Sequence, residues 1–68
     1  MTFVATVDRA RCEVVTMTGE LLTVTGWADR FGELGADPVH ARYCTTGPDA
    51  RGEPWTVDLF ALTRVVRR

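Results

Sequence analysis

The side chains that could perform covalent or acid–base chemistry in this chain are few. Among its 68 residues there is one histidine, His40, and there are two cysteines, Cys12 and Cys44. A nucleophilic cysteine needs a base such as histidine within hydrogen-bonding reach. His40 and Cys44 are four residues apart in a predicted strand, which separates them by roughly 13 Å, too far for that bond. We therefore expect a solvent-facing histidine, reduced thiols and no catalytic residue.

Five residue types are absent from the chain, namely Lys, Ser, Asn, Gln and Ile. Without Ser there is no Ser-His-Asp triad, and without Lys there is neither a Schiff base nor a phosphate-binding P-loop. Without Asn or Gln the bidentate amide contact to adenine is lost. The codons of Lys, Asn and Ile are rich in A and T, so their joint absence indicates a GC-rich genome of bacterial or phage type. Together the absences favour a binding protein over an enzyme.

A metal centre is not expected. Cys12, Cys44 and His40 would need a fourth ligand, and nothing shows the close-paired spacing of structural zinc sites. The acidic residues do not follow the alternating oxygen pattern of a calcium-binding loop. A disulfide between the cysteines requires neighbouring strands and an oxidising compartment, and we expect a reducing one. We therefore expect neither a metal nor another cofactor.

Aromatic and arginine side chains are the better candidates for function, because together they can stack on bases or contact a protein partner. Trp27, Arg30 and Phe31 form the most suggestive cluster. Trp27, Phe31 and Leu34 also fall at positions i, i+4 and i+7, which is one face of a short helix. Because large apolar residues are scarce, packing of these three on one end of the core is the favoured interpretation, and binding is the alternative.

All eight cations are arginines, set against nine acidic residues for a net charge of −1. Residues 1–37 carry three Arg and six acids, net −3, and residues 38–68 carry five Arg and three acids, net +2. The five could form a basic patch that contacts phosphates if their strands are adjacent, with solvated charge as the alternative. They are Arg42, Arg51, Arg64, Arg67 and Arg68. The candidate binding residues are therefore Trp27, Arg30, Phe31, His40, Arg42, Arg51 and Arg64.

Strands must position these side chains, because nine Val and ten Thr make up 19 of the residues and favour extended backbone. In residues 39–45 odd-numbered apolar side chains alternate with His, Arg and Cys, which predicts a strand with its odd-numbered face inward. Residues 55–59 repeat the pattern, again with the odd-numbered apolar side chains inward. Two Gly and two Pro in residues 46–54 predict a long, exposed hairpin tip between the two strands.

The first half of the chain predicts three further strands. Residues 11–17 and 21–27 flank a Thr-Gly-Glu turn and form a hairpin candidate, and residues 3–7 form the first strand. Gly26 shares a face with Leu22 and Val24, which predicts a bend or a close backbone approach at that glycine.

Two segments are expected to be helical turns or loops. Residues 27–35 predict one or two helical turns, or a loop, because two glycines disfavour a longer helix. Residues 60–63 predict a single helical turn that leads into a short last strand at residues 64–67.

Five or six short strands in a single domain of residues 1–68 predict an all-β fold, a small closed barrel with one short helical turn. Closure removes the exposed sheet edges of a short all-β chain. The pattern resembles the SH3-like and Sm-like barrels. Residues 26–31 are similar to the Gly-x-x-x-Phe-Asp-x-Phe region of Sm-type strands, and residues 62–66 to the close of such barrels. The aromatic and acidic residues are out of register and the second Sm signature lacks its Arg-Gly pair, so the resemblance concerns barrel topology and assigns no family.

The expected function is that of a small non-enzymatic interaction module acting through protein–protein association. Self-association into a homo-oligomer is included, because a chain this short buries only roughly 60% of its unfolded surface. The alternative is a nucleic-acid-binding barrel that uses Arg and aromatic side chains. No segment approaches the ~20 apolar residues of a membrane helix, and residues 1–7 lack the cationic start of a signal peptide. We therefore expect a soluble, cytoplasmic protein without membrane contact.

Overall fold

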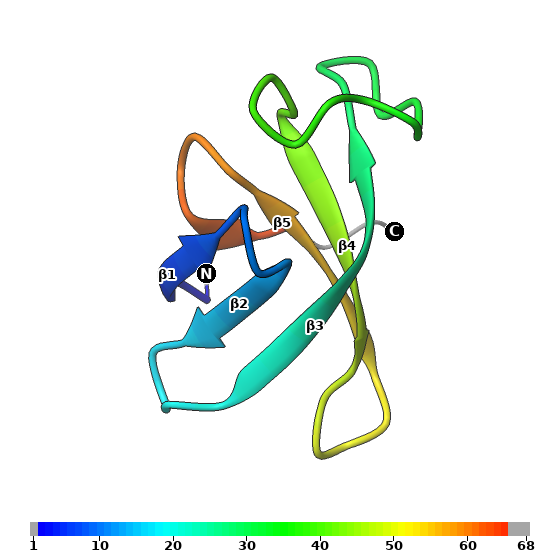
Figure 1. Ribbon diagram of the computed structural model, residues 1–68. Coiled ribbons are helices and arrows are strands. Elements are labelled where there is room, and N and C mark those ends of the chain that lie inside the picture. Colours follow the sequence, from blue (N-terminus) through cyan, green and yellow to red (C-terminus); the bar gives the residue numbers. More distant parts are fainter. Residues whose placement is uncertain (1, 66–68) are drawn as a thin grey trace.

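Six antiparallel strands, each paired with the next one along the chain, form the sheet of the computed structural model, which describes residues 2–65. Figure 1 shows how strongly the sheet coils. The described residues contain no helix, and so none that is long and apolar enough to cross a membrane. The strands are β1 (Val4–Asp8), β2 (Glu13–Thr16), β3 (Leu21–Ala28), β4 (Tyr43–Pro48), β5 (Pro54–Asp58) and β6 (Thr63–Arg64).

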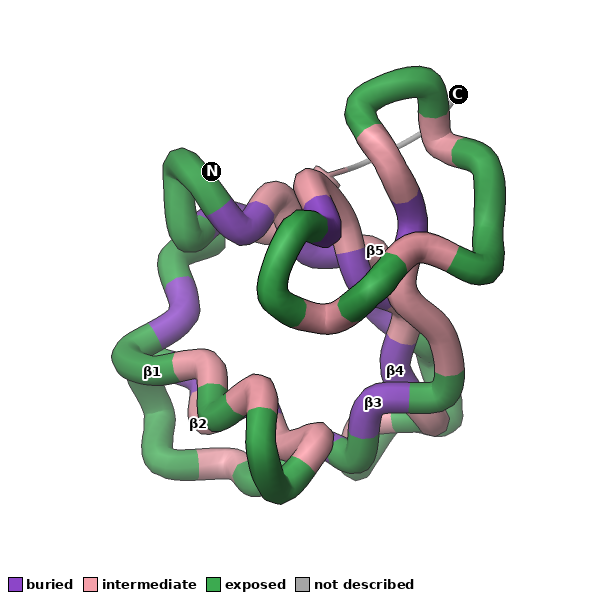
Figure 2. Tube along the Cα trace, turned by 45° about the horizontal axis from the view of Figure 1, so that its top comes forward, coloured by how far each residue is buried: buried purple, intermediate pink, exposed green. Residues whose placement is uncertain are grey.

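The first and last strands meet and nearly close the sheet into a barrel. Phe3 and Thr63 form an antiparallel bridge, and beside it the amide of Val4 donates to the carbonyl of Leu62 at 2.9 Å. In the tilted view of Figure 2 the chain runs around a common centre, which the core side chains fill. The prediction of a small all-β barrel is thus confirmed.

Strand β3 is long enough to serve both halves of the barrel. Its first half pairs with β2 and its second half with β4, and the register with β4 shifts between Val24 and Gly26. An ideal Cβ built on Gly26 would lie 3.1 Å from Thr45 Oγ1 and 3.2 Å from Leu34 Cδ2. The close approach predicted at Gly26 is therefore confirmed, because a larger residue would push these neighbours away.

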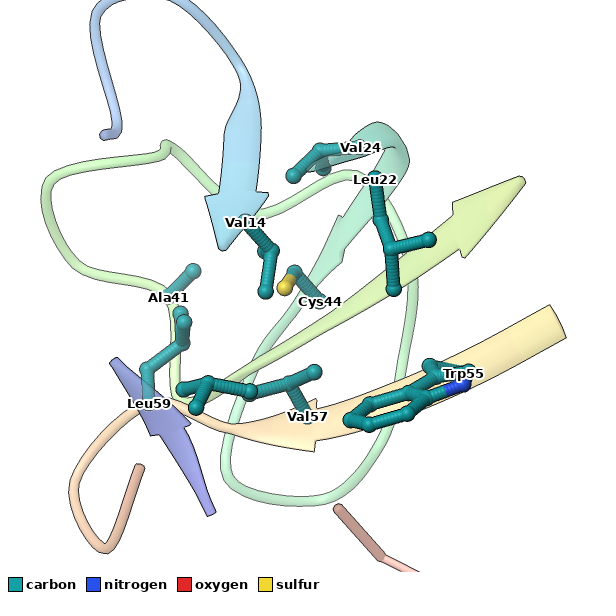
Figure 3. Close-up of a cluster of buried hydrophobic side chains, with 9 residues drawn as sticks. Val14, Leu22, Val24, Ala41, Cys44, Trp55, Val57 and Leu59 are labelled. Carbon is teal, nitrogen blue, oxygen red and sulfur yellow. The ribbon is translucent and has the colours of Figure 1, made fainter. Parts of the chain in front are cut away.

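The barrel interior is filled mainly by valine and leucine side chains, together with the ring of Trp55 (Figure 3). Val14, Cys44 and Val57 are the largest side chains that are fully buried. The odd-numbered side chains of residues 55–59 point inward, as predicted. The two predicted hairpins are present as β2–β3 and β4–β5, although the second has a shorter tip than expected because both of its strands extend into residues 46–54.

The strand predicted at residues 39–45 begins only at Tyr43, and its predicted faces are wrong at Val39 and Cys44, although Ala41 is buried as predicted. Asp37 starts a turn before it, in which its side chain accepts the amide of Val39 at 2.9 Å. Val39 is 71% exposed, whereas Cys44, predicted to face outward, is buried. The turn and the bend that follows it replace the extended backbone on which the two-residue alternation depends.

The segment at residues 27–35 contains no helical turn. Its first two residues end β3, and the rest is a loop that returns to the strand through a bridge between Ala28 and Leu34. Phe31 and Leu34 are exposed, and Trp27 is only partly buried. The predicted packing on the core is therefore wrong for Phe31 and Leu34, whereas Trp27 does pack against the core.

The segment predicted as a helical turn at residues 60–63 is a turn between β5 and β6. The side chain of Asp58 accepts the amides of Phe60 and Ala61 at 2.9 and 3.2 Å, a pattern that can also begin a helix. Leu62 then takes a positive φ of 52°, which a helix does not allow. The last strand ends at Arg64, and residues 66 and 67 of the predicted strand lie outside the described part of the chain.

Candidate functional site

A groove lies at the end of the barrel where the β3–β4 connection meets the β5–β6 turn, in the upper part of Figure 1. It has a volume of about 470 Å³ and is open to solvent. Six side chains line it, those of Asp29, Arg30, Phe31, His40, Arg42 and Phe60. Four of the six are among the predicted binding residues, so the fold brings into one groove side chains that the sequence separates.

The loop after β3 presents three of the groove residues, Asp29, Arg30 and Phe31. The side chain of Asp29 accepts the amides of Phe31 and Glu33 at 2.9 and 3.0 Å, and Gly32 supplies the positive φ of 81°. The guanidinium of Arg30 lies over the Phe31 ring, 4.9 Å from its centroid. The ring itself is 79% exposed. The turn therefore holds in solvent an aromatic side chain that the core does not use.

Arg42, just before β4, is held by a carboxylate and by aromatic rings. Its Nε and Nη2 atoms donate to the two carboxylate oxygens of Asp58 at 3.3 and 3.5 Å. Its guanidinium carbon lies 4.6 Å from the Phe60 ring centroid and 5.5 Å from that of Tyr43. Because the carboxylate and the rings fix the guanidinium together, the groove contains a cation that is positioned before any ligand arrives.

The ion pair shifts both pKa values in the direction that preserves its charges. The hydrogen bond to Asp58 raises the pKa of Arg42 against a smaller lowering by burial. Partial burial alone would raise the pKa of Asp58. The hydrogen bond from Arg42, the two backbone amides and the arginine charge together outweigh this effect and hold the pKa of Asp58 below its usual value. Both side chains therefore remain charged at neutral pH.

His40 reaches the groove from the turn that Asp37 starts. Its amide donates to the carbonyl of Asp37 at 2.9 Å, and the guanidinium of Arg9 donates to the carbonyl of Pro38 within the same turn. The imidazole is exposed and forms no hydrogen bond with a described residue. Its two ring nitrogens are therefore available to a ligand.

Comparison of the chain with protein-family models, with curated proteins and with solved structures finds no match. The groove is therefore interpreted from its own residues.

Three predicted binding residues lie outside the groove. Trp27 packs against the core, whereas Arg51 and Arg64 line a second pocket of about 350 Å³ at the opposite, hairpin end of the barrel. Arg67 and Arg68, which belonged to the predicted basic patch, lie outside the described residues. Among the described arginines of that patch, the structure places Arg42 at one end of the barrel and the other two at the other end.

At the hairpin end, side-chain contacts and hydrogen bonds join neighbouring segments of the chain. Arg64 lies over the ring of Trp55, 4.7 Å from its centroid, and donates to a carboxylate oxygen of Glu53 at 3.5 Å. The indole nitrogen of Trp55 donates to Asp49 at 2.9 Å, and this bond is the main cause of a lowered pKa at Asp49. The carboxylate of Glu20 accepts the amide of Ala50, which ties the β2–β3 turn to the tip of the β4–β5 hairpin.

The sequence interpretation missed Phe60 and the supporting role of the aspartates. Every aspartate of the chain accepts the backbone amide of the residue two positions later, and each of them thereby starts a turn. These residues are Asp8, Asp29, Asp37, Asp49 and Asp58. Asp is a typical first residue of such turns, so the five positions were a usable signal. Applied to Asp58, it would have predicted a turn that presents Phe60.

The two cysteines take no part in the groove. Burial raises the pKa of the Cys44 thiol to about 11, although the charge of Arg9 lowers it slightly. Such a thiol carries almost no reactive thiolate at neutral pH. Cys12 is partly buried, and the two thiols are not joined in a disulfide. Among residues 2–65, no group of three or more potential metal ligands is close enough to hold a metal ion.

Proposed function

We propose that this protein is a small non-enzymatic binding module that holds part of a protein partner in the groove. The observation that carries the proposal is the pair of aromatic rings in the groove, Phe31 and Phe60, which are 79% and 73% exposed. Covering such a ring is worth about 1.5–3 kcal/mol. Each ring also lies against a guanidinium. Aromatic and arginine side chains are the types enriched at protein interfaces.

The groove chemistry supports binding over catalysis. His40 has no neighbouring nucleophile among the residues that line the groove, and both cysteines lie outside the lining. The carboxylates of the groove region are engaged, since Asp58 pairs with Arg42 and Asp29 accepts backbone amides. General acid–base catalysis needs a free proton-transfer group that is positioned beside a reacting group. The described residues of the groove supply no pair of a nucleophile and a proton-transfer group.

The charge distribution favours a protein partner over a nucleic acid. A nucleic-acid site neutralises several phosphates with unpaired cations. In this barrel Arg42 and Arg64 lie at opposite ends, and each is paired with a carboxylate, Asp58 and Glu53 respectively. A carboxylate, that of Asp29, also lines the groove itself. Small barrels serve many functions, so the proposal rests on the groove and not on the fold.

The partner is either a different protein or a second copy of the chain, and sedimentation velocity over a range of concentrations distinguishes them.

Both cysteines are free thiols, which supports the proposal that the protein works in a reducing compartment such as the cytoplasm.

The first prediction tests the groove. Peptides are selected from a phage-displayed library of random 12-residue sequences on the immobilised full chain. The dissociation constants of the selected peptides are then measured for the wild type and for variants. We expect Phe31→Ala and Phe60→Ala each to weaken binding by about tenfold or more, since buried aromatic anchors dominate interfaces. Val39→Ala is the matched control, because Val39 is also exposed but does not line the groove.

Selected peptides that bind the two Phe variants as tightly as the wild type would overturn the proposal. A labelled single-stranded oligodeoxythymidine that binds at low salt, and loses affinity in the Phe variants, would identify a nucleic-acid site and overturn it as well.

A further inference from the structure

We propose that the groove recognises a short segment of the partner in which an acidic side chain stands next to an apolar one. This inference rests on the proposed function and adds the chemistry of the partner. It draws on four properties of the groove: the free donors of Arg42, the unpaired charge of Arg30, the two aromatic rings and the size of the groove.

The guanidinium of Arg42 retains donors for a carboxylate. A guanidinium has five N–H donors, and Asp58 uses one on Nε and one on Nη2, along one side of the group. No described residue accepts a hydrogen bond from Nη1. The end of the guanidinium, with one N–H on each Nη atom, therefore matches the two oxygens of a second carboxylate. Asp58 and the ring of Phe60 already hold this donor pair in place.

Arg30 adds a cation that has no internal partner. It forms no ion pair and no side-chain hydrogen bond with a described residue, and its guanidinium lies over the ring of Phe31. The lining contains two arginines and one aspartate, and because Arg42 is already paired with Asp58, Arg30 is the arginine of the lining that has no ion-pair partner among the described residues. Glu33 and Asp37 are in the same connection but do not line the groove. Arg30 therefore supplies an unpaired positive charge for a single carboxylate.

The two aromatic rings determine which side chain is favoured next to the carboxylate in the ligand. Phe31 and Phe60 each lie against one of the two arginines, at 4.9 and 4.6 Å from the guanidinium carbon. A ligand whose carboxylate meets a guanidinium therefore brings its adjacent side chain against a ring. An apolar side chain is favoured at that position because it removes exposed aromatic surface from water.

The size of the groove limits the ligand to a short segment. Six residues line it, whereas a standard interface between folded proteins uses about 20–30 residues on each side. A few consecutive residues of an extended chain therefore occupy the groove, and a second folded copy would need much more surface.

The second prediction uses the same selected peptides. We expect Asp or Glu to be enriched next to Phe, Trp, Leu or Met. Replacing the selected acid by its amide, Asp→Asn or Glu→Gln, should weaken binding by about tenfold, the effect of one charge-assisted hydrogen-bond pair. Arg30→Ala should cause a similar loss, and Arg42→Lys, which keeps the charge but removes the fork, should reduce the preference for the acid. Arg11→Ala, an exposed arginine outside the lining, is the matched control.

The outcomes separate this inference from the proposed function. Peptides that require Phe31 and Phe60 but carry no enriched acid, or that bind the Arg30→Ala variant normally, overturn the acidic ligand and leave the binding module intact. If the wild type forms a dimer at high concentration and Phe31→Ala abolishes it, a second copy of the chain occupies the groove. This result overturns the inference that a short segment is the occupant. Peptides that bind all four groove variants with the same dissociation constant as the wild type overturn both proposals. These variants are Phe31→Ala, Phe60→Ala, Arg30→Ala and Arg42→Lys.

Discussion

At the groove end of the barrel Arg42 lies 4.6 Å from the centre of the Phe60 ring, and at the hairpin end Arg64 lies 4.7 Å from that of Trp55. Each arginine is also paired with a carboxylate, at 3.3 and 3.5 Å. The two contacts are thus nearly the same in geometry. They differ in the aromatic ring, because Trp55 is 6% exposed whereas Phe60 is 73% exposed.

This difference shows that a contact between arginine and an aromatic ring does not by itself indicate a binding site. Trp55 belongs to the core and uses its indole N–H internally, so Arg64 covers a ring that the fold already needs. Phe60 belongs to a turn, and apart from the stacked guanidinium its ring is left to solvent. Substitutions at the hairpin end should therefore reduce the stability of the fold, and substitutions at the groove end should reduce the affinity for the partner.

The third prediction has the largest expected effect on stability and tests this contrast at the two rings. Trp55→Ala should destabilise the protein by about 3–5 kcal/mol through the cavity it leaves. Phe31→Ala should change the free energy of unfolding by no more than about 0.5 kcal/mol, because exposed side chains contribute little. Urea denaturation followed by circular dichroism measures both values.

A chain of this size has a total stability of roughly 0.05–0.15 kcal/mol per residue, so Trp55→Ala could leave it unfolded. Trp55→Phe then gives the measurable comparison, with a loss of about 1–2 kcal/mol, because it keeps an aromatic side chain but removes the indole bond to Asp49. Equal effects of Trp55→Phe and Phe31→Ala would contradict the distinction between the two ends.

The fourth prediction compares two arginines and expects a smaller effect. Arg64→Ala should lower the free energy of unfolding by about 0.5–1 kcal/mol, since it uncovers one face of Trp55. Arg30→Ala should leave stability unchanged, because Arg30 is exposed, lies over the exposed ring of Phe31 and forms no ion pair with a described residue. Thermal unfolding of the two variants beside the wild type measures the difference, and a loss of stability in Arg30→Ala would show that the groove end is also a structural brace.

The fifth prediction concerns pH and involves one carboxylate at each end. The pKa values of Asp49 and Asp58 are both lower in the folded protein than in the unfolded chain. A lowered pKa stabilises the fold above the unfolded value of about 3.9, and this contribution is lost as the pH falls through the folded value. Unfolding free energies measured between pH 7 and pH 2 should therefore decrease below about pH 4.

Asp49→Ala and Asp58→Ala should each make that decrease shallower. A slope that only one of the two substitutions reduces would show that acid sensitivity resides at one end of the barrel. A slope that neither substitution reduces would contradict the assignment of these two carboxylates.

The sequence was most informative where the backbone is extended. Residues 55–59 alternate between core and surface, and so their inward and outward faces were predicted correctly. Residues 39–45 show the same alternation but lie partly in the turn started by Asp37, where the period of two no longer applies. Periodicity predicts faces only when the backbone is regular, and a short-range side-chain bond can cancel it.

The grouping of these side chains into one groove could not be predicted from their positions in the sequence. Arg30, Phe31, His40 and Arg42 were singled out by residue type, but nothing in their spacing placed them together or separated them from Arg51 and Arg64. Phe60 joins them because the amide of Leu59 donates to the carbonyl of Arg42 at 2.9 Å, a bond that continues the pairing of Tyr43 with Asp58 in the β4–β5 hairpin. The register of this hairpin brings Phe60 close to Arg42, and the alternation of polar and apolar residues within either strand does not specify which residues are paired.

The seam between β1 and β6 has a consequence for how the barrel assembles. Every other strand pair joins neighbours in the chain, so each can form as a local hairpin at a small cost in loop-closure entropy. The bridge between Phe3 and Thr63, with the amide of Arg64 donating to the carbonyl of Thr2 at 2.7 Å, joins segments at opposite ends of the described chain. Folding rates fall as contacts become less local. The hairpins should therefore form early and the seam last, which makes it the step that commits the chain to the native barrel.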